Sequence, residues 1–228
     1  MSHKRFAIIL AGCGHLDGAE ITEASALNIA LSKAGFDITF YAPNREQLDT
    51  VDHLTGNNIT PNRNILAEAA RIARGDIFPI ESLDIDQFDG IAMAGGFGVI
   101  KNFTNFLEKG EHATLVEDIG LKLKEAIVKK VPIIAICAAP MALAIALKEL
   151  EITDATITFG YEENAGNFLP ALQAWEVDHI ETDIDEAYCD ENYRLITSGA
   201  YMKGDSTAYE IFLGAEACVA AFDLLDEQ

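Results

Sequence analysis

Short apolar runs alternate along this chain with longer segments of helical periodicity. The runs at residues 5–12, 37–43, 88–96 and 131–137 are largely hydrophobic, as in "RFAIILAG" and "VPIIAIC". A continuous apolar run is typical of a strand that is buried on both faces. Such strands need helices on both sides, so the pattern predicts an α/β fold with a doubly wound, mostly parallel sheet between two helical layers.

The segments between the runs carry helix signals. Residues 19–34 repeat apolar side chains at helical spacing, and Gly35 follows where a helix end favours glycine. Residues 64–75 end in Arg and Gly, and residues 114–130 form an amphipathic pattern with lysines in the last turn. Further helices are expected directly after residue 137 and from about residue 206 to 225.

From Asp154 onward the pieces become shorter. They begin with "ATITFG" (155–160), and "EAYCDENYRLITSG" (186–199) predicts two strands joined by a turn. The chain has no internal repeat, low-complexity tract or linker. Residues 1–228 are therefore expected to form a single domain.

Composition argues against two classes of partner and one kind of site. The chain has 16 Lys and Arg against 37 Asp and Glu residues, a net charge of −21. Nucleic acid and anionic membranes attract clustered cations, so neither is an expected partner. The four cysteines lie far apart without a Cys-x-x-Cys pair, which predicts neither a disulfide framework nor a metal site.

The N-terminal apolar stretch is short and runs into Gly-rich, acidic sequence. We interpret it as a first strand rather than a signal peptide. No run approaches the roughly 18 apolar residues of a membrane span. A cytoplasmic location is expected.

Unusual residues follow three of the predicted strands. "GCGHLDGAEITE" comes after the first strand, "AGGFG" ends the strand at 88–96, and "CAAP" follows the central one. Ligands bind at the carboxyl ends of the strands in such sheets. The shared position of the three segments predicts a site at this edge.

Cys137 stands where a predicted strand runs directly into a helix, as in a nucleophile elbow. Pro140 suits the first helical turn. The positive end of the helix dipole is expected to lower the pKa of the thiol. The backbone N–H groups of Ala138 and Gly96 would form an oxyanion hole. The alternative is an inert buried cysteine, because free cysteine is among the most buried residue types.

The stretches "LAGCGHLDGAEITEA", "AGGFGVIKNFTNF", "ICAAPMAL" and "ENYRLITSGAYM" resemble the ElbB family (enhancing lycopene biosynthesis protein, glyoxalase ElbB) of the DJ-one/PfpI superfamily. The resemblance covers most of the chain. It implies a flavodoxin-like, class I glutamine amidotransferase-like fold with the elbow after a central strand, and a homodimer.

The resemblance also implies which residues form the site. Cys137 would be the nucleophile, Gly96 and Ala138 the oxyanion donors, and Glu23 in "GAEITE" the paired carboxyl, with Glu20 as the second choice. A glutamate beside a thiolate should keep its proton, because burial and the like charge raise its pKa. The alternative for both glutamates is a solvated first-turn pair that favours the helix dipole.

Two departures from related families matter. The protease-like members place histidine directly after the cysteine, whereas this chain has Ala138. The amidotransferases carry a late His-x-Glu, which "DHIET" matches with His179 and Glu181, but their Gly-rich elbow is replaced by alanines. His179 is a secondary candidate, against the alternative of a surface or loop histidine, and His15 and His53 are weaker ones.

The resemblance implies a glyoxalase, a lyase that converts glyoxal, a small dicarbonyl substrate, to glycolate through a Cys137 hemithioacetal. It would need no cofactor, because the redox change is internal. Two alternatives stay open. One is a non-enzymatic redox-sensing or stress-protective protein that uses Cys137, with Cys13 as a resolving thiol if the first and central strands are neighbours. The other is an amidase-type hydrolase.

Overall fold

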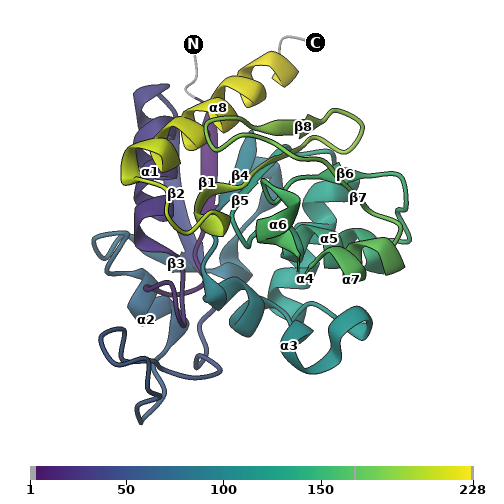
Figure 1. Ribbon diagram of the computed structural model, residues 1–228. Coiled ribbons are helices and arrows are strands. Elements are labelled where there is room, and N and C mark those ends of the chain that lie inside the picture. Colours follow the sequence, from purple (N-terminus) through teal and green to yellow (C-terminus); the bar gives the residue numbers. More distant parts are fainter. Residues whose placement is uncertain (1–3, 167, 227–228) are drawn as a thin grey trace.

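The central sheet of the computed structural model, which describes residues 4–166 and 168–226, has the strand order β3-β2-β1-β4-β5-β9-β8 (Figure 1). The strands are β1 (Arg5–Ile9), β2 (Asp37–Ala42), β3 (Ile77–Pro79), β4 (Gly90–Met93), β5 (Ile133–Ile136), β8 (Tyr188–Asp190) and β9 (Leu195–Ser198). Neighbouring strands are parallel except for β8, which is antiparallel to β9. The predicted mostly parallel sheet is confirmed.

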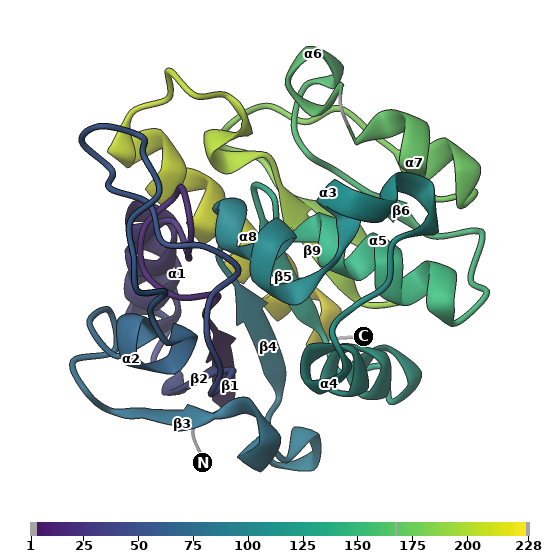
Figure 2. The same cartoon turned by 90° about the horizontal axis from the view of Figure 1, so that it is seen from below.

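Helices cover both faces of the sheet (Figure 2). The α-helices of the described residues are α1 (Ile21–Lys33), α2 (Ile65–Ala69), α3 (Phe106–Lys109), α4 (Glu117–Val128), α5 (Pro140–Glu149), α6 (Glu162–Ala165), α7 (Leu169–Ala174) and α8 (Ala208–Asp226). Helix α1 packs against α8, and α4 packs against α5 on the opposite face. Because β4 and β5 are covered on both sides, all of their residues are buried.

The direction in which the chain adds strands to the sheet reverses between β1 and β4. From β1 the chain passes through α1 to β2, and from β4 it passes through α4 to β5, so the two connections leave in opposite directions. Right-handed crossovers therefore place α1 and α4 on opposite faces of the sheet. Ile9 is level with Met93, and Met93 with Ala135, so the segments that follow β1, β4 and β5 start at the same edge.

Several elements differ from the sequence expectations. Only Ile65–Ala69 of the helix expected at 64–75 is an α-helix, and β4 ends at Met93, before the glycines. The expected adjacency of the first and central strands is wrong, because β4 lies between β1 and β5. A local sequence pattern shows that a strand is buried but not which strand lies beside it.

Two regions that the sequence pattern did not resolve contain short elements. After β4 come a π-helical turn at Val99–Phe103 and α3. After α5 come α6, α7 and a separate two-stranded sheet of β6 (Thr156–Ile157) and β7 (Asp178–His179). Short 3₁₀ helices lie at Ile80–Ser82, Ile85–Gln87, Gly110–His112 and Ala200–Met202. In the described part of the chain, no helix has the length and apolarity needed to cross a membrane.

Candidate active site

Cys137 occupies a strained elbow between β5 and α5. Its φ is +60°, in the left-handed region, and its backbone N–H donates a hydrogen bond of 2.9 Å to the carbonyl of Ser198 on β9. For a non-glycine residue this conformation costs about 1–2 kcal/mol of conformational free energy. The β9 hydrogen bond and Pro140, which opens α5, hold the turn in place. The predicted strained elbow is confirmed.

Glu23 of α1 is the carboxyl beside Cys137. The side chain is fully buried, and a hydrogen bond joins it to the thiol of Cys137. One carboxyl oxygen accepts the N–H of Gly95 at 2.9 Å, and the other accepts the N–H of Tyr201 at 3.3 Å. Burial raises the pKa of Glu23 to about 8, with a further rise from the charge of Glu20, although its hydrogen bonds act in the opposite direction. At neutral pH this carboxyl is mostly protonated.

The thiol of Cys137 does not have the lowered pKa that the helix dipole predicts. Burial, and then the carboxyl of Glu23, raise the pKa of Cys137 well above its ordinary value. The N–H groups of Gly96 and Ala138 donate to the sulfur and lower the pKa of Cys137, but the increase caused by burial and Glu23 is larger. The expected low-pKa thiolate is therefore wrong. The sequence shows that Cys137 precedes a helix, but it does not show that the sulfur is buried away from water.

The glycines of "AGGFG" allow the backbone to approach the sulfur. A Cβ atom at Gly95 would lie 2.6 Å from the Cβ of Cys137, closer than real side chains come. Gly96 has a φ of +92°, and a Cβ atom there would lie 2.5 Å from the carbonyl oxygen of Gly18. The two N–H groups on the sulfur, those of Gly96 and Ala138, are the predicted oxyanion donors. Both residues also line a cavity next to Cys137.

Glu20 has a different position from Glu23. Its carboxyl caps α1 by accepting the N–H of Glu23 at 2.7 Å, and it also lines a cavity next to Cys137. The three-residue spacing in "GAEITE" therefore separates one glutamate that caps the helix from one that touches the thiol.

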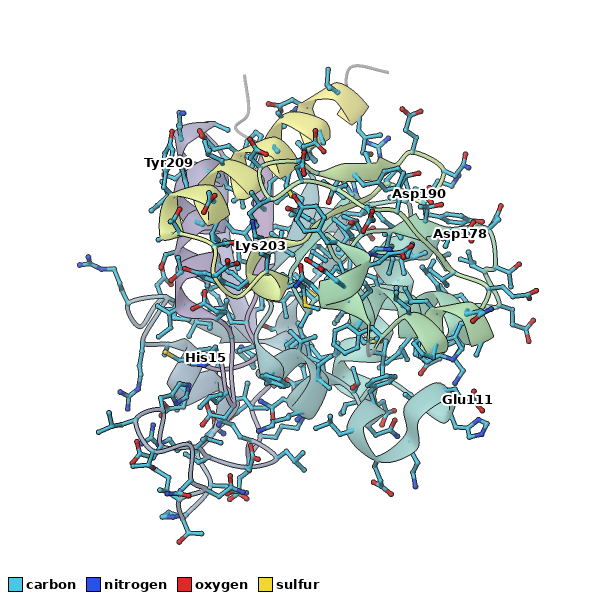
Figure 3. The ribbon with its side chains drawn as sticks, in the orientation of Figure 1. His15, Glu111, Asp178, Asp190, Lys203 and Tyr209 are labelled. Carbon is cyan, nitrogen blue, oxygen red and sulfur yellow. The ribbon has the colours of Figure 1, made fainter. Side chains whose placement is uncertain are left out.

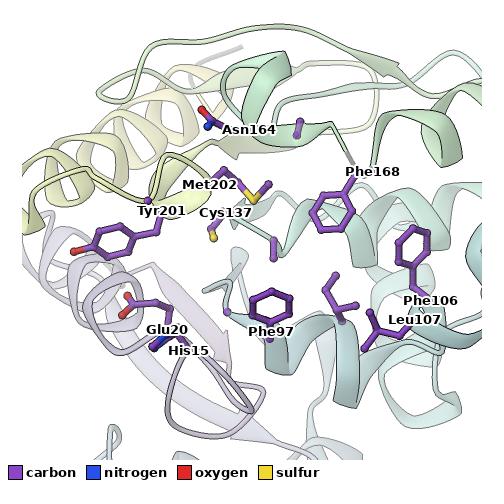
Figure 4. A pocket seen from close by; sticks show the side chains of 15 residues that line it. His15, Glu20, Phe97, Phe106, Leu107, Cys137, Asn164, Phe168, Tyr201 and Met202 are labelled. Carbon is purple, nitrogen blue, oxygen red and sulfur yellow. The ribbon is translucent and has the colours of Figure 1, made fainter. Parts of the chain in front are cut away.

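A cavity of about 670 Å³ opens beside Cys137 (Figure 4). His15, Glu20 and Tyr201 lie on one side of Cys137 in this view, and Phe106, Leu107 and Phe168 lie on the other. The sequence pattern indicates Glu20 and, more weakly, His15, but it gives no local signal for the aromatic side chains Phe106 and Phe168. The only sequence signal for Tyr201 is the stretch "ENYRLITSGAYM", which contains it.

Cys13 lies elsewhere. It is absent from the described lining of the cavity, and its charged neighbours are Glu68, Arg71, Asp17 and Arg63. Burial raises the pKa of the Cys13 thiol. The expectation that Cys13 and Cys137 share a cleft is wrong, because β4 separates the strands that lead to them.

His179 is not brought to Cys137 either. It lies on β7, where its Nε2 accepts the N–H of Phe159 at 3.1 Å, and burial lowers its pKa. Glu181 accepts the N–H of Glu162 at 2.8 Å, at the start of α6. The late His-x-Glu therefore supports local structure.

His53 has its ring nitrogens engaged. Its Nε2 accepts the N–H of Leu16 at 3.2 Å and its Nδ1 lies 3.0 Å from the carbonyl of Val51, while its ring meets that of His15 edge to face. Within the described residues, no group of three or more His, Cys, Asp or Glu side chains is arranged to hold a metal ion.

Comparison with known proteins places these features in a family. No family model matches the chain. The mitochondrial ES1 protein homolog of Rattus norvegicus is 35% identical over 205 residues, which cover 87% of this chain and 75% of the relative. Glutamine amidotransferase-like class 1 domain-containing protein 3 of Homo sapiens is 34% identical, with the same coverage.

Solved structures confirm the predicted fold class. An isoprenoid biosynthesis protein with an amidotransferase-like domain from Ehrlichia chaffeensis is 30% identical, with a TM-score of 0.88, and the match covers 97% of this chain and 99% of that one. DJ-1beta of Drosophila melanogaster shares the fold at 21% identity, with a TM-score of 0.53 over 99% of this chain and 97% of its own.

These comparisons correct one expectation and show the family. The predicted cytoplasmic location is wrong, because the relatives from rat, human and Danio rerio are all named mitochondrial. The relatives from human and Ehrlichia chaffeensis are both named for an amidotransferase-like domain. The chain belongs to the ES1 protein family, whose human member is named glutamine amidotransferase-like class 1 domain-containing protein 3.

Proposed function

We propose that this chain is a cofactor-independent glyoxalase-type enzyme that converts glyoxal and related small dicarbonyls to hydroxy acids. One observation carries the proposal: a buried carboxyl with a pKa of about 8 is hydrogen-bonded to a thiol that also receives two backbone N–H groups. Such a carboxyl can both accept and return a proton near neutral pH. Cys137 is the nucleophile, and Glu23 is the acid and base.

The first step forms a hemithioacetal. When the pair has lost one proton, Glu23 takes the thiol proton as the sulfur of Cys137 bonds to an aldehyde carbon. The carbonyl electron pair moves to oxygen, where the N–H groups of Gly96 and Ala138 stabilise the charge. Glu23 then returns the proton to this oxygen, and the carboxylate is regenerated.

The second step moves hydrogen between the two carbons. Glu23 removes the proton from the sulfur-bearing carbon, which gives an enediolate. The hydroxyl proton of that carbon passes to the neighbouring oxygen, and Glu23 delivers the carbon-derived proton to the neighbouring carbon. The first carbon is oxidised to a thioester, and the second is reduced to an alcohol. Water then cleaves the thioester, which releases glycolate and restores the thiol. The sum is glyoxal plus water to glycolic acid, so no external oxidant or reductant is needed.

Turnover measurements test the proposal. Glycolate formed from glyoxal is quantified for the wild type, Cys137→Ser, Glu23→Gln and the control Cys13→Ser. We expect Cys137→Ser and Glu23→Gln to lose at least about a hundredfold in kcat/KM, the range for removing a nucleophile or a general base. Cys13→Ser should keep its activity, because Cys13 lies outside the cavity lining. Equal rates in the wild type and Cys137→Ser would reject the mechanism.

Membership of the ElbB branch and assembly as a homodimer are further parts of the proposal. The name of the Ehrlichia chaffeensis relative, an isoprenoid biosynthesis protein, supports the resemblance to a family named for lycopene biosynthesis. Light scattering at several protein concentrations measures the oligomeric state. A mass of one chain at every concentration would reject the homodimer.

A further inference from the structure

The cavity beside Cys137 is much larger than glyoxal requires. Glyoxal has two carbons and two oxygens, whereas a cavity of about 670 Å³ falls in the range that holds drug-sized ligands. The reaction at the sulfur uses only the part of the cavity next to Cys137, Gly96 and Ala138. The remaining volume has no role in the chemistry proposed above.

The unused part of the cavity has apolar walls. Its large apolar side chains are Phe97, Ile100, Phe106, Leu107, Phe168 and Met202. The rings of Phe106 and Phe168 meet edge to face at 5.9 Å, and Phe168 also contacts Phe159 at 5.1 Å. These contacts hold the wall in place without a ligand.

Two of these apolar side chains are exposed to solvent. Phe97 is 52% exposed and Leu107 is 60% exposed. Apolar side chains gathered at the mouth of a cavity are typical of a binding site, because a ligand removes their surface from water.

The described lining of the cavity has no Lys or Arg side chain to bind an anionic group. It includes the carboxyl of Glu20 and the ring of His15, both on the side of Cys137 away from Phe106 and Phe168. The lysines next to lining residues are engaged elsewhere. Lys203, labelled in Figure 3, lies over the ring of Tyr161 at 5.9 Å, and Lys101 donates to Asp49 at 3.0 Å. A carboxylate or phosphate placed against the apolar walls, on the side of Cys137 away from His15, would be desolvated without a partner, which is costly.

We propose that this cavity selects neutral 2-oxoaldehydes that carry an aromatic or branched apolar group, and that it rejects substrates with a carboxylate or phosphate. The selectivity rests on the proposed function for the reacting group, but its physical basis is the apolar wall and the absence of Lys and Arg from the described lining. Burial of a phenyl group should favour such a substrate by about tenfold or more.

Alkylation of Cys137 tests the selectivity without relying on turnover. Iodoacetanilide carries a phenyl group, iodoacetate carries a carboxylate, and iodoacetamide carries neither. The rate at which each reagent alkylates Cys137 is followed by mass spectrometry of the Cys137 peptide. It is divided by the rate at which the same reagent alkylates glutathione, which corrects for intrinsic reactivity. We expect iodoacetanilide to exceed iodoacetamide by about tenfold or more and iodoacetate to be slowest. Cys13, outside the cavity lining, serves as an internal control. Equal normalised rates would overturn the proposal.

Two matched variants test whether the selectivity arises from the cavity lining. Leu107 on α3 lines the cavity, whereas Leu121 on α4 is absent from its described lining, and both are 60% exposed. Leu107→Lys should raise the iodoacetate rate severalfold and reduce the preference for the phenyl group. Leu121→Lys should leave both ratios as in the wild type. The same change in both variants would overturn the proposal.

Turnover separates this inference from the proposed function. The wild type should have a higher kcat/KM for phenylglyoxal than for glyoxal. Leu107→Lys should lower the ratio of these two kcat/KM values. A phenyl preference in alkylation without turnover of either dicarbonyl would overturn the reaction while supporting the selectivity. Turnover of glyoxal without any phenyl preference would support the reaction and overturn the selectivity.

Discussion

Cys137 and Glu23 form a proton-sharing pair in which each side chain sets the properties of the other. Burial raises the pKa of the Glu23 carboxyl to about 8, and burial together with that carboxyl raises the pKa of the Cys137 thiol. The reactive form is the pair that has lost one proton, because only then can the sulfur attack as its proton passes to Glu23.

The pH dependence of Cys137 alkylation should report this pair. Below about pH 8 both groups hold their protons, so the rate with iodoacetamide should rise with pH and level off above the first ionisation near 8. In Glu23→Gln the inflection near pH 8 should disappear, because the ionising carboxyl is gone. Rates measured from pH 6 to 9.5 check this. A rate that is already constant between pH 6 and 8 would indicate a low-pKa thiolate instead.

The ends of three elements assemble the site. The start of α1 supplies Glu23, the segment after β4 supplies the N–H groups of Gly95 and Gly96, and the elbow after β5 supplies Cys137. Glu20 caps α1, and its charge also raises the pKa of Glu23. The same side chain thus connects helix stability with the chemistry of the pair.

Two substitutions at Glu20 should separate these effects. Glu20→Ala removes the cap and should lower the free energy of unfolding by about 1 kcal/mol. Glu20→Gln keeps an acceptor oxygen, so most of that loss should be avoided, but it removes the charge and should move the alkylation inflection to lower pH. Urea unfolding and the alkylation profile measure the two effects. Equal loss of stability in both variants would argue against the cap.

The whole chain is acidic, yet one glutamate, Glu23, is fully buried beside Cys137. The net charge of −21 maintains solubility, while Glu23 is taken out of water in the core. A buried carboxyl with a raised pKa binds its proton more tightly in the folded state than in the unfolded state.

Folding stability should therefore depend on pH through Glu23. Between about pH 4.5 and 8 the unfolded chain releases this proton and the folded chain keeps it, so stability should fall as pH rises. The slope is up to about 1.4 kcal/mol per pH unit. Glu23→Gln stays neutral and should lack this contribution. Urea unfolding of both proteins at pH 5, 6.5 and 8 should show the wild type losing stability relative to the variant. A constant difference would contradict the raised pKa.

Local sequence patterns alone indicate the buried strands, the parallel sheet and the position of the elbow. "VPIIAIC" followed by "AAP" identifies a buried strand that enters a helix at Cys137, because each signal lies within a few neighbouring residues. The residue partnered with Cys137 followed from the resemblance, and the structure brings Glu23 to it.

Long-range packing sets the strand order, the direction in which the Cys137 pKa shifts and the residues of the cavity wall. The position of β4 between β1 and β5 separates Cys13 from Cys137. Burial raises the thiol pKa where the helix end alone predicts a lower one. Phe106 and Phe168 meet across segments that lack a clear local pattern. All three depend on contacts between residues far apart in the chain, and burial and desolvation are properties of those contacts rather than of any local stretch.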